Sequence, residues 1–127
     1  AWVVNGATID GRAVDEMSLM GPTRICKSGR NQEQVDEEVK PSDFGLDLAE
    51  VKDLQGGDAV ANAKILEDIL AGREKGVKRD MVLLNAAAAM ACAGLADNLE
   101  GGLAKGRKVI ADGSAFERLR LLKEIAK

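Results

Sequence analysis

The spacing of hydrophobic residues changes near Pro41, and the change divides the chain into a part that predicts strands and a part that predicts helices. Before Pro41, short strand-like segments are separated by glycine-containing segments, which is typical of strands joined by turns. The predicted strands are residues 2–4, 23–27 and 34–39, with a Gly-containing loop over residues 5–12 and a hairpin turn over residues 28–31. Pro41 closes this part, because proline cannot donate to a sheet ladder.

After Pro41, apolar residues recur at three- and four-residue steps, which is the period of an amphipathic helix. Asp47-Leu48-Ala49-Glu50 has the spacing of a capping box, so a short helix is predicted from Leu48 to Leu54. Asp58 is placed to cap a second helix, which Gly72 ends. The buried face predicted for that second helix consists of Val60, Ala63, Leu66, Ile69 and Leu70.

Three further helices are predicted in the second half of the chain. Met81 to Ala93 is apolar almost all round apart from Asn85, which predicts a fully buried helix that ends at Gly94. The next helix is marked by Leu99, Leu103 and Ile110 and contains Gly101, Gly102 and Gly106. Each glycine weakens a helix by roughly 1 kcal/mol relative to alanine, so their presence indicates close backbone packing on one side. The last helix is predicted from a second capping box, Ser114-Ala115-Phe116-Glu117, with Phe116, Leu119, Leu122 and Ile125 as its buried stripe.

Composition narrows the class of protein. With 127 residues, 46% of them hydrophobic, the chain fits one soluble globular domain with a real core. A net charge of −3, without a basic stripe or an aromatic platform, argues against a nucleic-acid surface. The absence of histidine removes the commonest general base and most zinc sites. Cys26 and Cys92 lie far apart and are predicted to be reduced, buried thiols of a cytoplasmic protein.

The N-terminal run Ala1-Trp2-Val3-Val4 opens directly in an apolar, strand-like segment. It is too short for a signal peptide or a membrane span, and it lacks the polar lead expected of a cytosolic N-terminus. We therefore expect the chain to begin inside a larger protein, at a strand that has neighbours there.

Two adjacent carboxylates, Asp15 and Glu16, stand a few residues before the turn pair Gly21-Pro22. Mg²⁺ takes oxygen ligands and often uses one or two carboxylates together with substrate phosphates, so the pair suits a magnesium site. A solvated acidic turn fits the same residues. Consecutive side chains of a regular strand point to opposite faces, so both carboxylates can serve one ion only if the backbone is irregular or one of them acts through water.

Two other polar features are read as structural. Gly56-Gly57-Asp58 before a helix resembles a phosphate cradle, but Asp58 would occupy the helix amides and repel an anion, which favours a joint between helices. Asn85 is the strongly polar side chain of an apolar helix, and a buried amide must be hydrogen-bonded. We expect it to tether a neighbouring loop, with direct contact to a substrate as the less favoured alternative.

Four sequence blocks together carry a resemblance to a known family. They are Val14-Asp15-Glu16-Met17-Ser18-Leu19-Met20-Gly21-Pro22-Thr23-Arg24, Pro41-Ser42-Asp43-Phe44-Gly45-Leu46, Asp53-Leu54-Gln55-Gly56-Gly57-Asp58 followed by Asn62, and residues 79–89, Arg-Asp-Met-Val-Leu-Leu-Asn-Ala-Ala-Ala-Ala. In this order, over nearly the whole chain, they resemble the C-terminal half of anthranilate phosphoribosyltransferases.

The resemblance implies an α/β fold in which residues 1–127 form the C-terminal segment of a large α/β domain, with short strands and a hairpin followed by packed helices. It implies a cytoplasmic enzyme of tryptophan biosynthesis that transfers the phosphoribosyl group from phosphoribosyl diphosphate to anthranilate. By the same resemblance, Asp15 and Glu16 bind Mg²⁺ and, through it, phosphoribosyl diphosphate. The parent enzyme is expected to be a homodimer with no nucleic-acid or membrane partner.

The chain also departs from the family pattern. Asn5-Gly6 stands where many members have His-Gly, and the loop from Ala7 to Val14 is longer than usual. The Gly-rich diphosphate loop, the anthranilate contacts and the helical dimer domain are not in this sequence, so the chain alone is expected to be inactive. A relative of pyrimidine-nucleoside phosphorylase and a non-catalytic binding relative of the same fold remain as alternatives.

Overall fold

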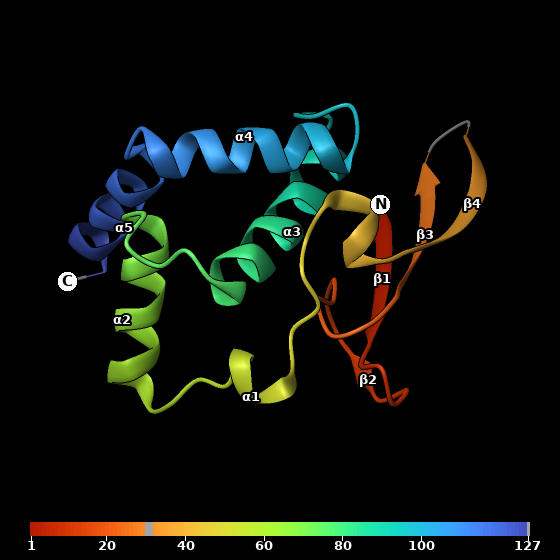
Figure 1. The fold of residues 1–127 in the computed structure, drawn as a ribbon. Coiled ribbons are helices and arrows are strands. Elements are labelled where there is room, and N and C mark those ends of the chain that lie inside the picture. The colour runs from red at the N-terminus through yellow and green to blue at the C-terminus, as the bar shows by residue number, and fades with distance from the viewer. Residues whose placement is uncertain (30–31, 127) are drawn as a thin grey trace.

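Four antiparallel strands form one sheet in the order β2-β1-β3-β4 in the computed structural model, which describes residues 1–29 and 32–126 (Figure 1). The strands are β1 (Trp2–Ala7), β2 (Ala13–Val14), β3 (Thr23–Gly29) and β4 (Gln32–Val39). The predicted hairpin is confirmed: β3 and β4 pair from Thr23 opposite Val39 to Gly29 opposite Gln32, with a shift of register between Lys27 and Gly29. Residues 30 and 31 of its predicted turn lie outside the described residues.

Strand β1 is three residues longer than predicted. Gly6 and Ala7 pair with the short strand β2, and the amide of Ala7 also donates to the carbonyl oxygen of Pro22 at 2.9 Å. The turn is therefore confined to residues 8–12, where Thr8 and Arg12 exchange backbone and side-chain hydrogen bonds. The prediction of a loop over residues 5–12 was wrong because the glycine there continues a strand.

Helices follow the sheet, as the sequence predicts. They are the 3₁₀ turn η1 (Pro41–Phe44) and the α-helices α1 (Val51–Leu54), α2 (Ala59–Leu70), α3 (Val77–Cys92), α4 (Leu99–Ala111) and α5 (Ser114–Ile125). Figure 1 shows α3 in the middle, between the sheet on one side and α2 and α5 on the other, with α4 running across one end. The predicted fold class, a small sheet with packed helices in an α/β arrangement, is confirmed.

One of the three predicted helix caps has the predicted geometry. Asp58 caps α2 by accepting from the amide of Ala61 at 2.8 Å. Helix α1 begins at Val51 instead of Leu48, because the amide of Ala49 donates to the carbonyl oxygen of Leu19 and keeps the chain extended there. Helix α5 begins after Gly113 without a side-chain cap from Ser114.

The core lies between the inner face of the sheet, the loop after β2, and helices α3 and α4. Its largest fully buried apolar side chains are Met17, Leu19, Ile25, Leu83, Leu84 and Leu103. Trp2 on β1 packs against this core, and the ammonium group of Lys27 lies 4.4 Å from the centre of its ring. The core therefore joins the strand part and the helix part of the chain.

Burial along the helices is less extensive than predicted. In α2 Ile69 is buried, whereas Val60 and Leu66 are exposed, and in α5 Leu122 and Ile125 are exposed. Helix α3 buries one side only. Both cysteines are free thiols as predicted, but Cys26 is half-buried and Cys92 exposed, so the prediction that they are buried was wrong.

Helices α3 and α4 approach each other closely at two glycines. A Cβ atom on Gly102 would lie 2.7 Å from the Cα of Ala87, and one on Gly106 would lie 2.8 Å from a methyl group of Leu83. The prediction that glycines in α4 allow close backbone packing is confirmed at Gly102, whereas Gly106 makes room for a side chain of α3. Within the described residues, no helix has the length and apolar character needed to cross a bilayer.

Candidate metal-binding site

The acidic pair lies directly after β2, where the chain leaves the sheet. Strand β2 ends at Val14, and Asp15 and Glu16 form a bend instead of continuing the strand. The irregular backbone that two adjacent carboxylates need in order to serve one ion is therefore present. Both residues are exposed, whereas Met17, Ser18 and Leu19 immediately after them are buried. The pair thus sits on a rim, with the core directly behind it.

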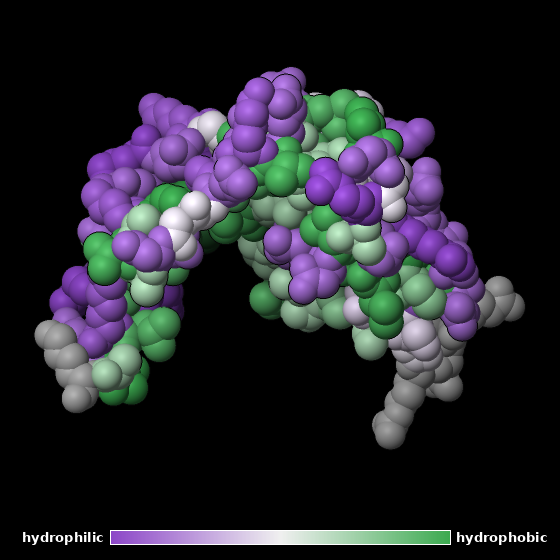
Figure 2. Space-filling view, turned by 90° about the horizontal axis from the view of Figure 1, so that it is seen from below, coloured by the Kyte–Doolittle hydropathy of each residue, from purple (hydrophilic) through white to green (hydrophobic). Residues whose placement is uncertain are grey.

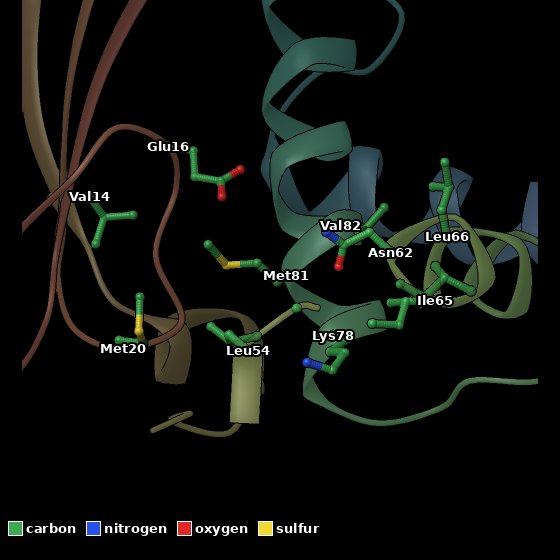
Figure 3. Close-up of a pocket in the computed structure, with 12 residues that line it drawn as sticks. Val14, Glu16, Met20, Leu54, Asn62, Ile65, Leu66, Lys78, Met81 and Val82 are labelled. Atoms are coloured by element: carbon green, nitrogen blue, oxygen red, sulfur yellow. The ribbon is translucent and has the colours of Figure 1, made fainter. Parts of the chain in front are cut away.

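Glu16 lines a cleft of about 350 Å³ between this bend and the helices. Val14 and Met20 line the same side as Glu16, and Leu54, Ile65 and Met81 are among the apolar residues opposite (Figure 3). Figure 3 shows the carboxylate of Glu16 directed across the cleft toward α3. In Figure 2, seen from below, a hollow separates the sheet side from the helix side, and hydrophobic residues are exposed on its walls. Of the acidic pair, Glu16 faces this cleft and Asp15 does not line it.

Asn85 of α3 holds the residue that follows the acidic pair. Its side-chain oxygen accepts from the amide of Met17 at 2.9 Å, and its side-chain nitrogen donates to the carbonyl oxygen of Met17 at 3.0 Å. The same nitrogen donates to the carbonyl oxygen of Met81, one turn earlier in the helix, at 3.1 Å. The predicted tether between Asn85 and a neighbouring loop is confirmed, and the tethered loop is the one that carries Asp15 and Glu16.

Three further residues fix this loop from the sheet side. Ser18 donates from its hydroxyl to the carbonyl oxygen of Ala7 at 2.7 Å, and its amide donates to the hydroxyl of Thr23 at 2.9 Å. Gly6 lets the loop approach the sheet, because a Cβ atom there would lie 2.3 Å from the carbonyl oxygen of Glu16. The roles of Ser18, Thr23 and Gly6 in fixing this loop were not predicted from the sequence. The hydroxyl residues Ser18 and Thr23, close to the apolar residues of this loop, were the available signal.

Without a cation, the surroundings of the bend disfavour the ionised form of the Glu16 carboxyl. The core behind the rim partly desolvates the Glu16 carboxyl and raises its pKa above the ordinary value, and the negative charge of Asp15 raises that pKa further. A bound cation would reverse this effect, since it favours the ionised form of both acids. The carboxylate oxygens are the donor type that Mg²⁺ prefers.

The pair offers few protein ligands. Over residues 1–29 and 32–126, no group of three or more His, Cys, Asp or Glu side chains gathers to hold a metal ion. A magnesium ion usually keeps several waters or phosphate oxygens and needs only one or two carboxylates, so the donor set still fits it.

The Gly56-Gly57-Asp58 segment forms a joint between α1 and α2, as predicted. Asn62 accepts from the amide of Gly57 at 2.8 Å and donates to the carbonyl oxygen of the same residue at 2.9 Å. Together with the cap that Asp58 supplies to α2, these bonds occupy polar groups that an anion would need. The joint closes one end of the cleft, because Leu54, Gly56 and Asn62 line it.

Comparison with known proteins identifies a family that matches almost the whole chain. The profile of a family described as "Glycosyl transferase family, a/b domain" matches residues 2–116. The chain is 42% identical over 114 residues to an anthranilate phosphoribosyltransferase of Anaeromyxobacter dehalogenans strain 2CP-1, which covers 90% of this chain and 33% of the relative. It is 46% identical over 121 residues to the enzyme of that name from Rhodopseudomonas palustris strain BisB5, covering 95% and 34%. The chain therefore spans about a third of the length of the curated relatives it matches.

Solved structures of two anthranilate phosphoribosyltransferases share the fold of this chain. The anthranilate phosphoribosyltransferase of Thermus thermophilus superposes with a TM-score of 0.81 at 32% identity, over 94% of this chain and 33% of that one. The enzyme of Saccharomyces cerevisiae in complex with PRPP and Mg superposes with a TM-score of 0.80 at 25% identity and the same coverage.

Proposed function

Because the chain belongs to the glycosyl transferase family with the a/b domain, we propose that it is the C-terminal segment of an anthranilate phosphoribosyltransferase. The intact enzyme transfers the phosphoribosyl group of phosphoribosyl diphosphate to the amino nitrogen of anthranilate, a reaction of tryptophan biosynthesis. Relatives of that name at 42% and 46% identity support this proposal.

The acidic pair is the observation that carries the proposal. Asp15 and Glu16 stand in an irregular bend from which Glu16 lines the cleft, and the bend is held from both the sheet and α3. We assign Asp15 and Glu16 as ligands of Mg²⁺, which supplies positive charge to the diphosphate as it leaves. The structure of the Saccharomyces cerevisiae enzyme in complex with PRPP and Mg supports Mg²⁺ as the metal of this assignment.

In this assignment the residues of the segment contribute by holding carboxylate oxygens, and through them the metal ion, in fixed positions. Glu16 holds an oxygen donor at one edge of the cleft, Asp15 precedes it in the same bend, and apolar residues such as Met81 line the opposite side. Displacement at the sugar carbon needs the leaving group neutralised and the reactants aligned, so fixed donors are the main contribution of this segment. The described residues contain no histidine base, and the reaction assigned here does not require one from this segment.

We propose further that this segment is inactive by itself and that the parent enzyme is a homodimer. The curated relatives are about three times as long, and we place the contacts to anthranilate and the diphosphate loop in the part of those enzymes that the chain does not span. Measurable turnover of anthranilate and phosphoribosyl diphosphate by this chain with Mg²⁺ would contradict the first of these statements.

The assignment of the acidic pair is tested by metal binding. Mn²⁺, a paramagnetic substitute for Mg²⁺, is titrated into the chain with and without phosphoribosyl diphosphate and followed by electron paramagnetic resonance. The double variant Asp15→Asn, Glu16→Gln should lose binding, because both carboxylate donors are removed while the size of each side chain is kept. The matched control is Asp47→Asn, an exposed acid outside the cleft, which should bind like the wild type. Equal binding by the double variant and the wild type would refute the assignment.

A further inference from the structure

The contacts of Asn85 point to a role beyond holding the fold together. We propose that Asn85 is a positioning residue, which sets the orientation of the Asp15 and Glu16 carboxylates by fixing the backbone on both sides of Met17. This inference rests on the proposed function, because it concerns the same acidic pair. Asn85 lies 68 positions from Met17 in the sequence, so the contact joins the strand part of the chain to α3.

The geometry of the contact restrains the acidic pair directly. The amide of Met17, which Asn85 binds, belongs to the peptide group that also contains the carbonyl of Glu16. That carbonyl oxygen lies against Gly6, where a Cβ atom would approach to 2.3 Å. The peptide between Glu16 and Met17 is therefore held by α3 on one side and by β1 on the other. Rotation of this peptide would redirect the side chain of Glu16.

The chemistry of the contact requires an amide side chain. One oxygen accepts from Met17, and one nitrogen uses its two hydrogens on the carbonyl oxygens of Met17 and Met81. Aspartate keeps the acceptor but loses both donors, and it places another negative charge near Glu16. Alanine loses every contact. Replacing a residue that orients a metal ligand commonly lowers metal affinity by about 10- to 100-fold.

A structural role alone would predict something different. If Asn85 only stabilised the fold, its replacement would lower stability without changing the metal affinity of the molecules that remain folded. A matched control for stability is Asn98→Ala, which removes the cap of α4 given by the bond between the Asn98 side chain and the amide of Gly101 at 2.8 Å. Asn98 lies outside the residues that contact the acidic bend.

The experiment measures Mn²⁺ affinity by electron paramagnetic resonance in the wild type, Asn85→Ala and Asn98→Ala, with folding verified by circular dichroism. Amide hydrogen exchange at Met17 is measured in the same samples. We expect Asn85→Ala to weaken Mn²⁺ binding by about 10-fold or more and to speed exchange at Met17. Asn98→Ala should change neither quantity. If Asn85→Ala does not fold, Asn85→Leu, which keeps the size of the side chain and adds no charge, is judged by the same criterion.

The outcomes separate the two proposals. Wild-type Mn²⁺ affinity in a folded Asn85 variant, with binding still lost in the double variant of Asp15 and Glu16, would overturn the positioning role and leave the proposed function intact. Failure of the wild type to bind Mn²⁺ with phosphoribosyl diphosphate would overturn the proposed metal-binding function of the acidic pair and the positioning role with it.

Discussion

Gly102 lies at the closest approach of α3 and α4, and Gly102→Ala tests whether this contact limits the stability of the core. A Cβ atom on Gly102 would lie 2.7 Å from both the Cα and the carbonyl oxygen of Ala87, and 2.8 Å from its Cβ. Non-bonded carbon atoms prefer separations of about 3.5–4.0 Å, so the two helices would have to move apart by roughly 1 Å. Two of the three contacted atoms belong to the backbone and cannot rotate away.

The expected magnitude is the difference between two opposing effects. Overpacking a well-packed core usually costs about 1–3 kcal/mol, and the backbone contacts place Gly102 in the upper part of this range. Alanine returns about 1 kcal/mol, because it is the better helix former. We therefore expect Gly102→Ala to lower the free energy of unfolding by about 1–2 kcal/mol.

The neighbouring glycine provides the matched control. A Cβ atom on Gly101 would lie 3.2 Å from the side-chain oxygen of Asn98 and 3.8 Å from the Cβ of Ala96, and neither is a backbone atom. Gly101→Ala should therefore leave stability unchanged or raise it by up to about 1 kcal/mol. Urea unfolding followed by circular dichroism measures both variants, with equal slopes required for the comparison. A Gly102→Ala variant as stable as Gly101→Ala would refute the argument, because the helices would then have room for a methyl group.

Two further predictions concern the acidic bend and the core. Because the pKa of Glu16 is raised by burial and by Asp15, its protonated form stabilises the folded state, and this contribution is lost as pH rises above the ordinary range of glutamate. Glu16→Gln should thus gain stability relative to the wild type between acidic and neutral pH, measured by urea unfolding at several pH values, and a difference independent of pH would contradict this. Leu84 is 1% exposed and Leu122 is 61% exposed, so Leu84→Ala should cost about 2–5 kcal/mol and Leu122→Ala less than about 0.5 kcal/mol. If thermal or urea unfolding shows equal losses of stability in the two variants, the side chain of Leu122 on α5 is not exposed as described.

The features that could be predicted from the sequence have strong local signals. The hairpin follows from two strand-like segments on either side of a glycine-containing turn, and Asp58 caps α2 because a single side chain can reach the exposed amides. Asn85 could be identified because one amide in an apolar helix must find partners. These signals depend on a few neighbouring residues or on one unavoidable requirement.

The features that could not be predicted depend on contacts distant in the sequence. The capping box at Asp47 fails because Leu19, far away in the chain, binds the amide of Ala49. Apolar periodicity marks a face of a helix but not what covers it, and Leu122 remains exposed for that reason. For the acidic bend, sequence predicts the two carboxylates, but the roles of Gly6 and Ser18 require knowledge of how the sheet meets the loop.

Trp2 is the single tryptophan of a chain that has no tyrosine, and it sits on β1 beneath the ammonium group of Lys27. Its fluorescence consequently reports the place where the sheet packs against the core, while the far-ultraviolet dichroism signal comes mainly from α2 to α5. Denaturation curves from the two optical probes, recorded on one sample, would coincide if both parts melt as a single cooperative unit and separate if they do not.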